Sequence, residues 1–298
     1  MMTRTRRSAL PATPWMGLIG AALVLAPHAA KAQPSDLFYE RTVMSAAGER
    51  CGLFTPAISA ALAASAAQAR GAALRAGTDQ KALDNLKRTA RMRADAVACD
   101  SPSVTEPAAR VRNAFAGYQR ITRMNYPGTI SIWSADRGVG RTARWRLAQS
   151  AYFGSNRMIF GIAGREGTTS ALVAVADFPD NATPYAARLV FRDNARAASP
   201  YLSGSARQPL SSKLPPRSAT KMFMAEARGS AEAELLPKGA ADAWAFRFPT
   251  AAVQALSELD PREAVAVEFL LSGDRVRTAY VEVGDFAAGR AFLQLASR

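Results

Sequence analysis

The chain has 298 residues, of which 49% are hydrophobic and 21% charged, a composition typical of a globular protein with one large domain or two small ones. Lysine and arginine exceed aspartate and glutamate by 14. The single histidine, His28, lies in an N-terminal segment that we expect to be removed. Ser-His-Asp and Cys-His catalysis are therefore excluded from the mature chain.

Residues 1–32 are typical of a secretory signal peptide. Three arginines precede an apolar run over 16–27, and Ala30-Lys31-Ala32 matches a small-x-small cleavage site. We expect cleavage after Ala32 and a periplasmic or secreted location, with retention as an N-terminal anchor as the alternative. The apolar run is shorter than the roughly 20 residues of a membrane helix, and no other run reaches that length. We therefore expect no transmembrane span after cleavage.

The net charge falls from +14 by four, to +10, when the leader with its four basic residues is removed. One interpretation is an anionic partner, such as an envelope polymer. The other is a solvated basic surface without a partner. The arginines are scattered and no run of five like charges occurs, so the pattern lacks the basic tail of a nucleic-acid-binding protein. No nucleic acid is expected as a partner.

Residues 33–126 follow helical periodicity and predict a helical region. Two helices of similar length, over 55–76 and 79–98, are expected to form an antiparallel hairpin rich in alanine. Cys51 precedes the first of these helices and Cys99 follows the second. In an oxidising compartment such a pair forms a disulfide, which we expect to close the open end of the hairpin.

Residues 127–298 follow a different pattern, in which short β-rich segments alternate with Gly, Asp, Asn and Pro turns. The predicted strands cover residues 143–150, 157–163, 170–176, 186–192, 220–227, 243–248, 264–271 and 276–283. About eight strands at this spacing predict an antiparallel β-sandwich, with short helices added to it. The predicted fold class is therefore α+β, with a helical region over 33–126 and a sandwich domain over 127–298.

The last part of the chain carries a family resemblance. Strand 245–249 leads into a short helix, two strands follow over 264–269 and 278–283, and Gly284-Asp285-Phe286-Ala287 opens a final helix. This order resembles the end of the invasion-associated locus B family of secreted β-sandwich proteins. The resemblance implies a secreted, non-enzymatic sandwich with a role at the envelope or in host-cell interaction. That family usually carries cysteines within its sandwich, and the predicted sandwich of this chain has none. The helical N-terminal half is also unlike the family. The resemblance therefore assigns no functional residue to this chain.

Aromatic residues and arginines gather at the predicted junction of the helical and β regions. The candidate binding residues are Tyr118, Arg120, Arg123, Tyr126, Trp133, Arg144, Trp145 and Arg146. Such a group can bind a glycan or a lipid head group through stacking rings and cationic donors. The alternative is a buried core between the two regions that is rimmed by arginines. No catalytic residue, cofactor or metal site is predicted.

The function that this pattern predicts is a non-catalytic periplasmic or secreted protein that binds or organises a component of the cell envelope. One alternative is a carboxylate-dependent hydrolase of envelope polymers. Its candidate residues are Glu226, Glu232, Glu234, Glu268 and Glu282. Glu268 and Glu282 alternate with apolar strand residues and are expected to face solvent. A second alternative is a module that docks on an envelope protein through the alanine-rich hairpin.

Overall fold

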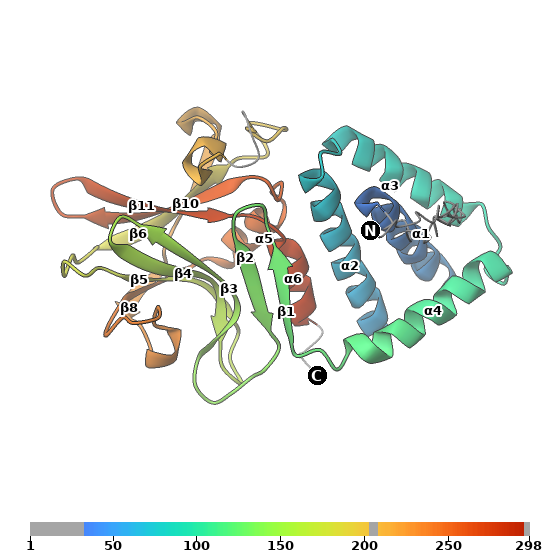
Figure 1. The fold of residues 1–298 in the computed structure, drawn as a ribbon, viewed down its shortest axis with the longest axis horizontal. Helices are drawn as coiled ribbons and strands as arrows, with labels where there is room; N and C mark the ends of the chain where they lie inside the picture. Colours follow the sequence, from blue (N-terminus) through green and yellow to red (C-terminus); the bar gives the residue numbers. More distant parts are fainter. Residues whose placement is uncertain (1–32, 203–207, 295–298) are drawn as a thin grey trace, which may run out of the picture. The chain divides into compact units, whose positions relative to one another are not determined.

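The fold is that of a computed structural model, which describes residues 33–202 and 208–294. The predicted leader and its cleavage site after Ala32 lie outside the described residues. Within them the chain is α+β, with six α-helices, a seven-stranded antiparallel sheet and a four-stranded antiparallel sheet (Figure 1). The predicted fold class is confirmed.

Four helices form the N-terminal part: α1 (Pro34–Cys51), α2 (Pro56–Arg75), α3 (Gln80–Asp95) and α4 (Pro102–Tyr118). Local sequence explains where they begin. The Thr55 hydroxyl accepts a hydrogen bond from the Ile58 N–H, and the Asp79 carboxylate accepts one from the Ala82 N–H. Each cap satisfies a backbone donor that has no partner inside its helix.

The predicted hairpin of the second and third helices is wrong, because α2 and α3 both pack on α1 rather than along each other. Phe38 of α1 fills the space that the alanines of α2 leave, and it joins a core cluster with Leu74 and Leu83. The hairpin that does form consists of α1 and α2, which the four residues 52–55 connect.

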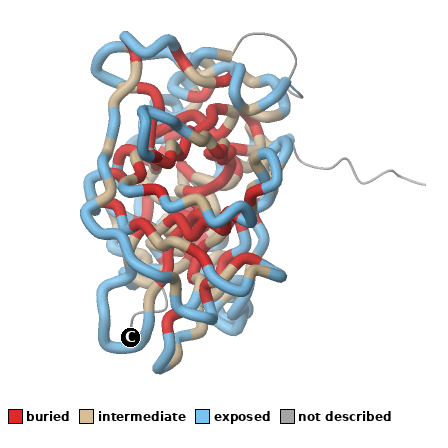
Figure 2. The backbone as a smooth tube through the Cα atoms, turned by 90° about the vertical axis from the view of Figure 1, so that its left-hand side faces the viewer, coloured by how far each residue is buried: buried red, intermediate tan, exposed pale blue. Residues whose placement is uncertain are grey.

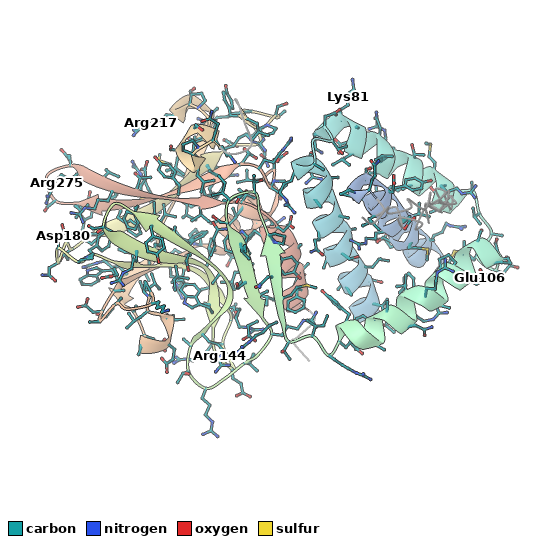
Figure 3. The ribbon with its side chains drawn as sticks, viewed as in Figure 1. Lys81, Glu106, Arg144, Asp180, Arg217 and Arg275 are labelled. Carbon is teal, nitrogen blue, oxygen red and sulfur yellow. A yellow bond between two sulfur atoms is a disulfide. The ribbon has the colours of Figure 1, made fainter. Side chains whose placement is uncertain are left out.

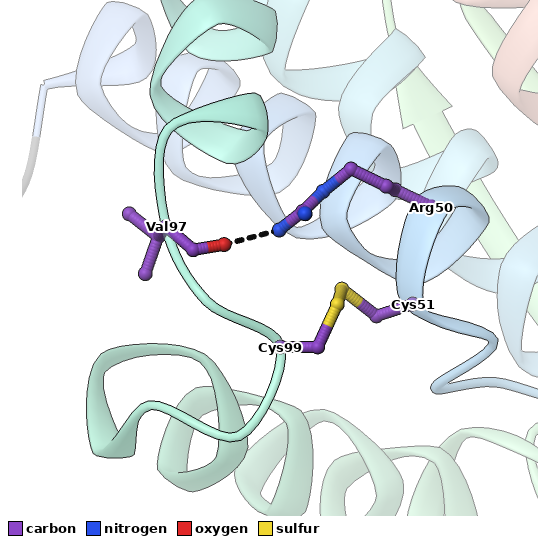
Figure 4. The surroundings of a disulfide bond; sticks show 4 residues. All are labelled: Arg50, Cys51, Val97 and Cys99. Atoms are coloured by element: carbon purple, nitrogen blue, oxygen red, sulfur yellow. Dashed lines mark hydrogen bonds between the residues drawn. A yellow bond between two sulfur atoms is a disulfide. The ribbon is translucent and has the colours of Figure 1, made fainter.

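The predicted disulfide is confirmed, but it joins different elements. Cys51 ends α1 and Cys99 follows α3, with Cα atoms 5.6 Å apart (Figure 4). Arg50 donates a hydrogen bond to the Val97 carbonyl beside it. Ala47 and Ala94 pack in one cluster at this end. The bridge therefore holds the C-terminal ends of α1 and α3 together.

The strands form two sheets. They are β1 (Arg123–Pro127), β2 (Ile132–Asp136), β3 (Arg144–Phe153), β4 (Asn156–Gly164), β5 (Ala171–Asp177), β6 (Ala186–Arg192), β7 (Thr220–Met224), β8 (Ala227–Ser230), β9 (Trp244–Phe248), β10 (Ala264–Leu271) and β11 (Arg275–Glu282). The larger sheet has the order β1-β2-β3-β4-β5-β9-β8, and the smaller has the order β11-β10-β6-β7. All eight predicted strands are present. The additional strands are β1, β2 and β8, and the β part begins at Arg123 rather than at residue 127.

The core lies between the two sheets, where Phe160 and Phe246 of the larger sheet pack in one cluster with Val267 and Phe269 of the smaller. The buried residues gather in the interior of the molecule, and the exposed ones lie around it (Figure 2). Two short helices, α5 (Thr250–Ser257) and α6 (Phe286–Gln294), complete this layer. Helix α6 packs against β1, β2 and β3 and is also the principal contact of α2 with the sandwich. The smaller sheet and the two helices therefore share the inner face of the larger sheet.

Candidate functional site

Two of the predicted binding residues, Tyr126 and Trp133, lie in the core. Their exposed fractions are 1% and 0%. The Trp133 indole N–H donates to the carbonyl oxygens of Glu282 and Val283, at 3.1 and 2.9 Å, and its ring packs edge-on against Phe286. These two rings therefore stabilise the core and present no surface on which a ligand could stack.

Tyr118 also packs inward, against Phe292 of α6. The guanidinium of Arg137 lies 4.7 Å from the centre of the Tyr118 ring and 3.6 Å from that of Phe292. Its Nε donates to the Phe292 carbonyl and its Nη1 to the Tyr118 carbonyl. Burial lowers the pKa of this guanidinium. The Arg137 side chain therefore connects the end of α4 to α6. This arrangement is the one predicted by the alternative in which these residues form a buried core.

The exposed members of the predicted group are Arg120, Arg123 and Arg144. Arg123 forms an ion pair with Asp136, at 2.8 Å. Arg144 lies at an outer edge of the sandwich (Figure 3). The Trp145 indole N–H donates to the Leu235 carbonyl, on the face of the large sheet that turns away from the main core.

Arg146 differs from the rest of the predicted group, because it is buried and also lines a large cavity. The pairing of β3 with β4 shifts between Trp145 and Leu147, so that Arg146 is the extra residue of a β-bulge. A bulge breaks the alternation of a strand and redirects a side chain. The alternating sequence Arg144-Trp145-Arg146 suggests two arginines on one face, yet Arg144 is exposed and Arg146 is only 8% exposed.

The charge of Arg146 has no ion-pair partner among the described residues. Its Nε donates to the Asp136 carbonyl at 3.0 Å and its Nη2 to the Arg137 carbonyl at 3.3 Å, whereas no described residue accepts from Nη1. Burial lowers the pKa of this guanidinium, and the Asp136 carboxylate offsets part of that effect. That carboxylate is itself hydrogen bonded to Arg123 and to the Gly138 N–H.

The cavity that Arg146 lines, which we name the arginine cleft, has a volume of about 780 Å³. It lies between the β4–β5 connection, the end of β9 and the helices α5 and α6. Its apolar lining consists of Val139, Ile162, Ala171, Leu172, Phe248, Val253 and Leu293, and its charged lining of Arg146, Arg165, Arg247, Arg290, Glu166 and Glu226. The volume is in the range of small-molecule sites, about 300–1,000 Å³. The charged lining carries four positive and two negative groups.

The other three arginines of the cleft also lack carboxylate partners in the described part of the chain. Arg290 is half-buried, and its Nη1 donates to Gln254 Oε1 at 3.1 Å and to Ser257 Oγ at 3.0 Å. Arg165 and Arg247 are exposed and form no side-chain hydrogen bond with a described residue. Sequence reasoning missed these three arginines. They come from a turn, a strand and a helix, and no spacing in the sequence indicates that they meet.

The carboxylates proposed for hydrolysis do not lie together in one site. The expectation that Glu282 faces solvent is wrong: its side chain is 0% exposed and accepts hydrogen bonds from the N–H groups of Thr129, Ile130 and Ser131, at 2.7 to 2.8 Å. Glu268 is half-buried and forms an ion pair with Arg188. Both carboxylates hold structure together and neither lines the arginine cleft.

Of the remaining acidic candidates, Glu226 lines the arginine cleft and is exposed there, while Glu232 and Glu234 are exposed elsewhere. Among the described residues no group of three or more His, Cys, Asp or Glu side chains is placed to hold a metal ion. The cleft therefore brings together four arginines, two glutamates and apolar walls.

None of the described helices has the length and apolarity needed to cross a membrane. The disulfide is compatible with an oxidising location outside the cytoplasm. The resemblance of residues 245–289 to the invasion-associated locus B family stays a prediction. Comparisons of the chain with protein family models, with curated proteins and with solved structures found no match.

Proposed function

We propose that this protein is a non-catalytic periplasmic or secreted protein that binds an anionic component of the cell envelope, and that the arginine cleft is its binding site. The observation that carries the proposal is Arg146, a cation that is 8% exposed, lines a cleft and has no ion-pair partner among the described residues.

A buried charge without a counter-ion destabilises the folded state. A protein that keeps such a charge therefore has a reason for it, such as a ligand that binds there. Arginine presents a planar set of N–H donors that fits carboxylate and phosphate oxygens. Three further arginines on the same cleft add to the attraction and outnumber its two glutamates, and the chain without residues 1–32 carries a net charge of +10. A negatively charged ligand would supply the missing counter-ion.

The proposed location rests on the predicted leader and on the disulfide, which persists in oxidising compartments. An envelope component is an anionic ligand available there. The absence of histidine from residues 33–298 and the occupied carboxylates Glu268 and Glu282 support a binding role over a catalytic one.

Binding of the purified mature protein to lipopolysaccharide and to peptidoglycan fragments tests the proposal, by titration calorimetry at low and high salt. We expect binding that weakens at high salt, because salt screens exposed charges. The rim variant R165Q/R247Q should lose most of this binding. The control R120Q/R144Q removes the same charge from exposed arginines outside the cleft and should retain it. Equal losses in the two variants, or no binding by the unmodified protein, would overturn the proposal.

A second candidate, hydrolysis of an envelope polymer, has one observation in its favour: Glu166 and Glu226 both line the arginine cleft. Both are exposed, whereas a catalytic acid of this class usually has a buried, apolar setting. The test is whether the protein releases soluble fragments from peptidoglycan. Release by the unmodified protein that is lost in both E166Q and E226Q would favour hydrolysis over binding alone.

The third candidate, docking through the alanine-rich helices, has less surface available than the sequence suggests. Helix α2 packs on α1 along one side and on α6 along another. Of its three buried alanines, Ala64, Ala69 and Ala73, the last two belong to a core cluster with Phe38. Most of the alanine surface that would receive a partner is therefore occupied within the chain.

A further inference from the structure

The arginine cleft combines a cationic group with an apolar surface, and this combination narrows the class of ligand. Seven apolar side chains line the cleft, from strands β4, β5 and β9, from helices α5 and α6, and from the β2–β3 connection. Val253 and Leu293 are partly buried hydrophobic residues packed against the main core. A ligand with a charge alone would leave this surface in contact with water.

The lining also argues against a sugar as the main contact. Sugar rings pack on exposed aromatic faces, and the one aromatic residue of the cleft, Phe248, is only 2% exposed. The rings of Tyr126 and Trp133 are in the core. Flexible apolar chains, in contrast, need accessible aliphatic walls, which Val139, 52% exposed, and the partly buried Val253 and Leu293 supply.

We infer that the ligand of the arginine cleft is an anionic amphiphile, with a phosphate or carboxylate head group held by Arg146 and an acyl chain on the apolar lining. The inference rests on the proposed function and specifies its ligand. Nη1 of Arg146 has no acceptor among the described residues and is the donor that a head-group oxygen would use. The hydroxyls of Thr169 and Ser170, exposed on the β4–β5 connection, line the same cleft.

The test uses dodecyl phosphate below its micelle concentration, measured by titration calorimetry with the mature protein. Three comparison ligands separate the two parts of the inference: inorganic phosphate lacks the chain, dodecyl maltoside lacks the charge, and dodecanoate exchanges the phosphate for a carboxylate. We expect dodecyl phosphate and dodecanoate to bind at least about tenfold more tightly than inorganic phosphate or dodecyl maltoside.

Variants assign the binding to the cleft. R146M should weaken dodecyl phosphate binding by at least about tenfold, and R146K should restore part of it, because charge-assisted hydrogen bonds are among the strongest polar contacts. L293N should weaken dodecyl phosphate but leave inorganic phosphate unchanged. The matched control V276N replaces an exposed apolar residue of β11 outside the cleft and should change neither. Near-ultraviolet circular dichroism confirms that each variant is folded.

The outcomes separate this inference from the proposed function. If inorganic phosphate and dodecyl phosphate bind equally, or if L293N has no effect on dodecyl phosphate, the amphiphile inference fails while the anion-binding function stands. Binding to phosphatidylglycerol vesicles without any binding of the monomeric amphiphiles would instead identify a membrane surface as the ligand and overturn the inference. Absence of binding to every anion, lipopolysaccharide included, contradicts the proposed function itself.

Discussion

The guanidinium of Arg75, the last residue of α2, donates two hydrogen bonds to the carboxylate of Asp285, at 2.7 and 2.8 Å. Asp285 immediately precedes α6, so this pair joins the helical part to the sandwich across 210 residues of sequence. The side chains are 13% and 1% exposed. A bidentate pair of this kind fixes geometry as well as charge, and it sets the position of α2 on α6.

The approach of α2 to Asp285 depends on Gly71. A Cβ atom at this position would lie 2.1 Å from Asp285 Oδ1, so we expect Gly71→Ala to displace the carboxylate and to lower the free energy of unfolding by about 1–3 kcal/mol. Urea denaturation measures the change. The control is Gly117→Ala in α4, where a Cβ would meet no atom within 4 Å and the better helix propensity should raise stability by up to about 1 kcal/mol. Equal effects at the two glycines would contradict the expectation.

Asp285 predicts a pH dependence of stability. Burial raises the pKa of its carboxyl, and Arg75 opposes this only in part. The folded chain therefore binds the proton at a higher pH than the unfolded chain, whose value is about 3.9. This group's contribution to stability is larger at acidic pH and declines as the pH rises through the folded pKa.

The comparison of the unmodified chain with Asp285→Asn isolates that contribution. We expect the unfolding free energy of the unmodified chain, minus that of the variant, to decrease between about pH 4 and pH 7. Urea denaturation at several pH values measures it. A difference that stays constant or increases with pH would show that Asp285 does not titrate as its burial indicates.

Removal of the Glu282 charge is expected to lower the free energy of unfolding substantially. Glu282→Gln replaces a carboxylate that accepts three backbone N–H groups by an amide, whose NH₂ faces those donors. We expect a loss of about 2–4 kcal/mol in unfolding free energy. Glu268→Gln, on the neighbouring strand, breaks only a partly exposed ion pair with Arg188 and should cost less. The opposite order in urea denaturation would refute the role assigned to Glu282.

The disulfide predicts a redox-dependent stability. It closes a loop of 48 residues, and the chain-entropy model gives up to about 4 kcal/mol for a loop of that length. Addition of dithiothreitol should therefore lower the thermal midpoint of the unmodified chain. The variant C51S/C99S should unfold at this lower temperature with or without the reductant. A midpoint that does not respond to dithiothreitol would mean that the bridge does not form or does not stabilise the fold.

Much of the β part could be predicted from the sequence, because alternation and turn residues are local signals. Strands β6 and β10 have the predicted bounds, and the other six predicted strands are shifted by a few residues at most. The strands β1 and β2 were missed because each has only five residues and β1 follows closely on helix α4. Their pairing is stabilised from outside, by α6 and by the carboxylate of Glu282 in their turn.

The disulfide pair could also be predicted, since two cysteines in an oxidising compartment allow one pairing. The elements that it joins could not. The sequence indicates that α2 and α3 have similar length and a short connection, but the packing depends on which helix fills the space beside the small alanines. Phe38 of α1 occupies that space, and α1 thus lies against both helices.

The sequence by itself determined the local elements, the cysteine pair and the absence of histidine from residues 33–298, because each of these follows from residue type and spacing. Only the tertiary structure decided which charged residues are buried. Arg146 and Glu282 both sit in alternating strand sequences that favour exposure, yet a bulge turns the first toward a cleft and a distant turn covers the second. Burial depends on contacts between elements far apart in sequence, and no local pattern encodes them.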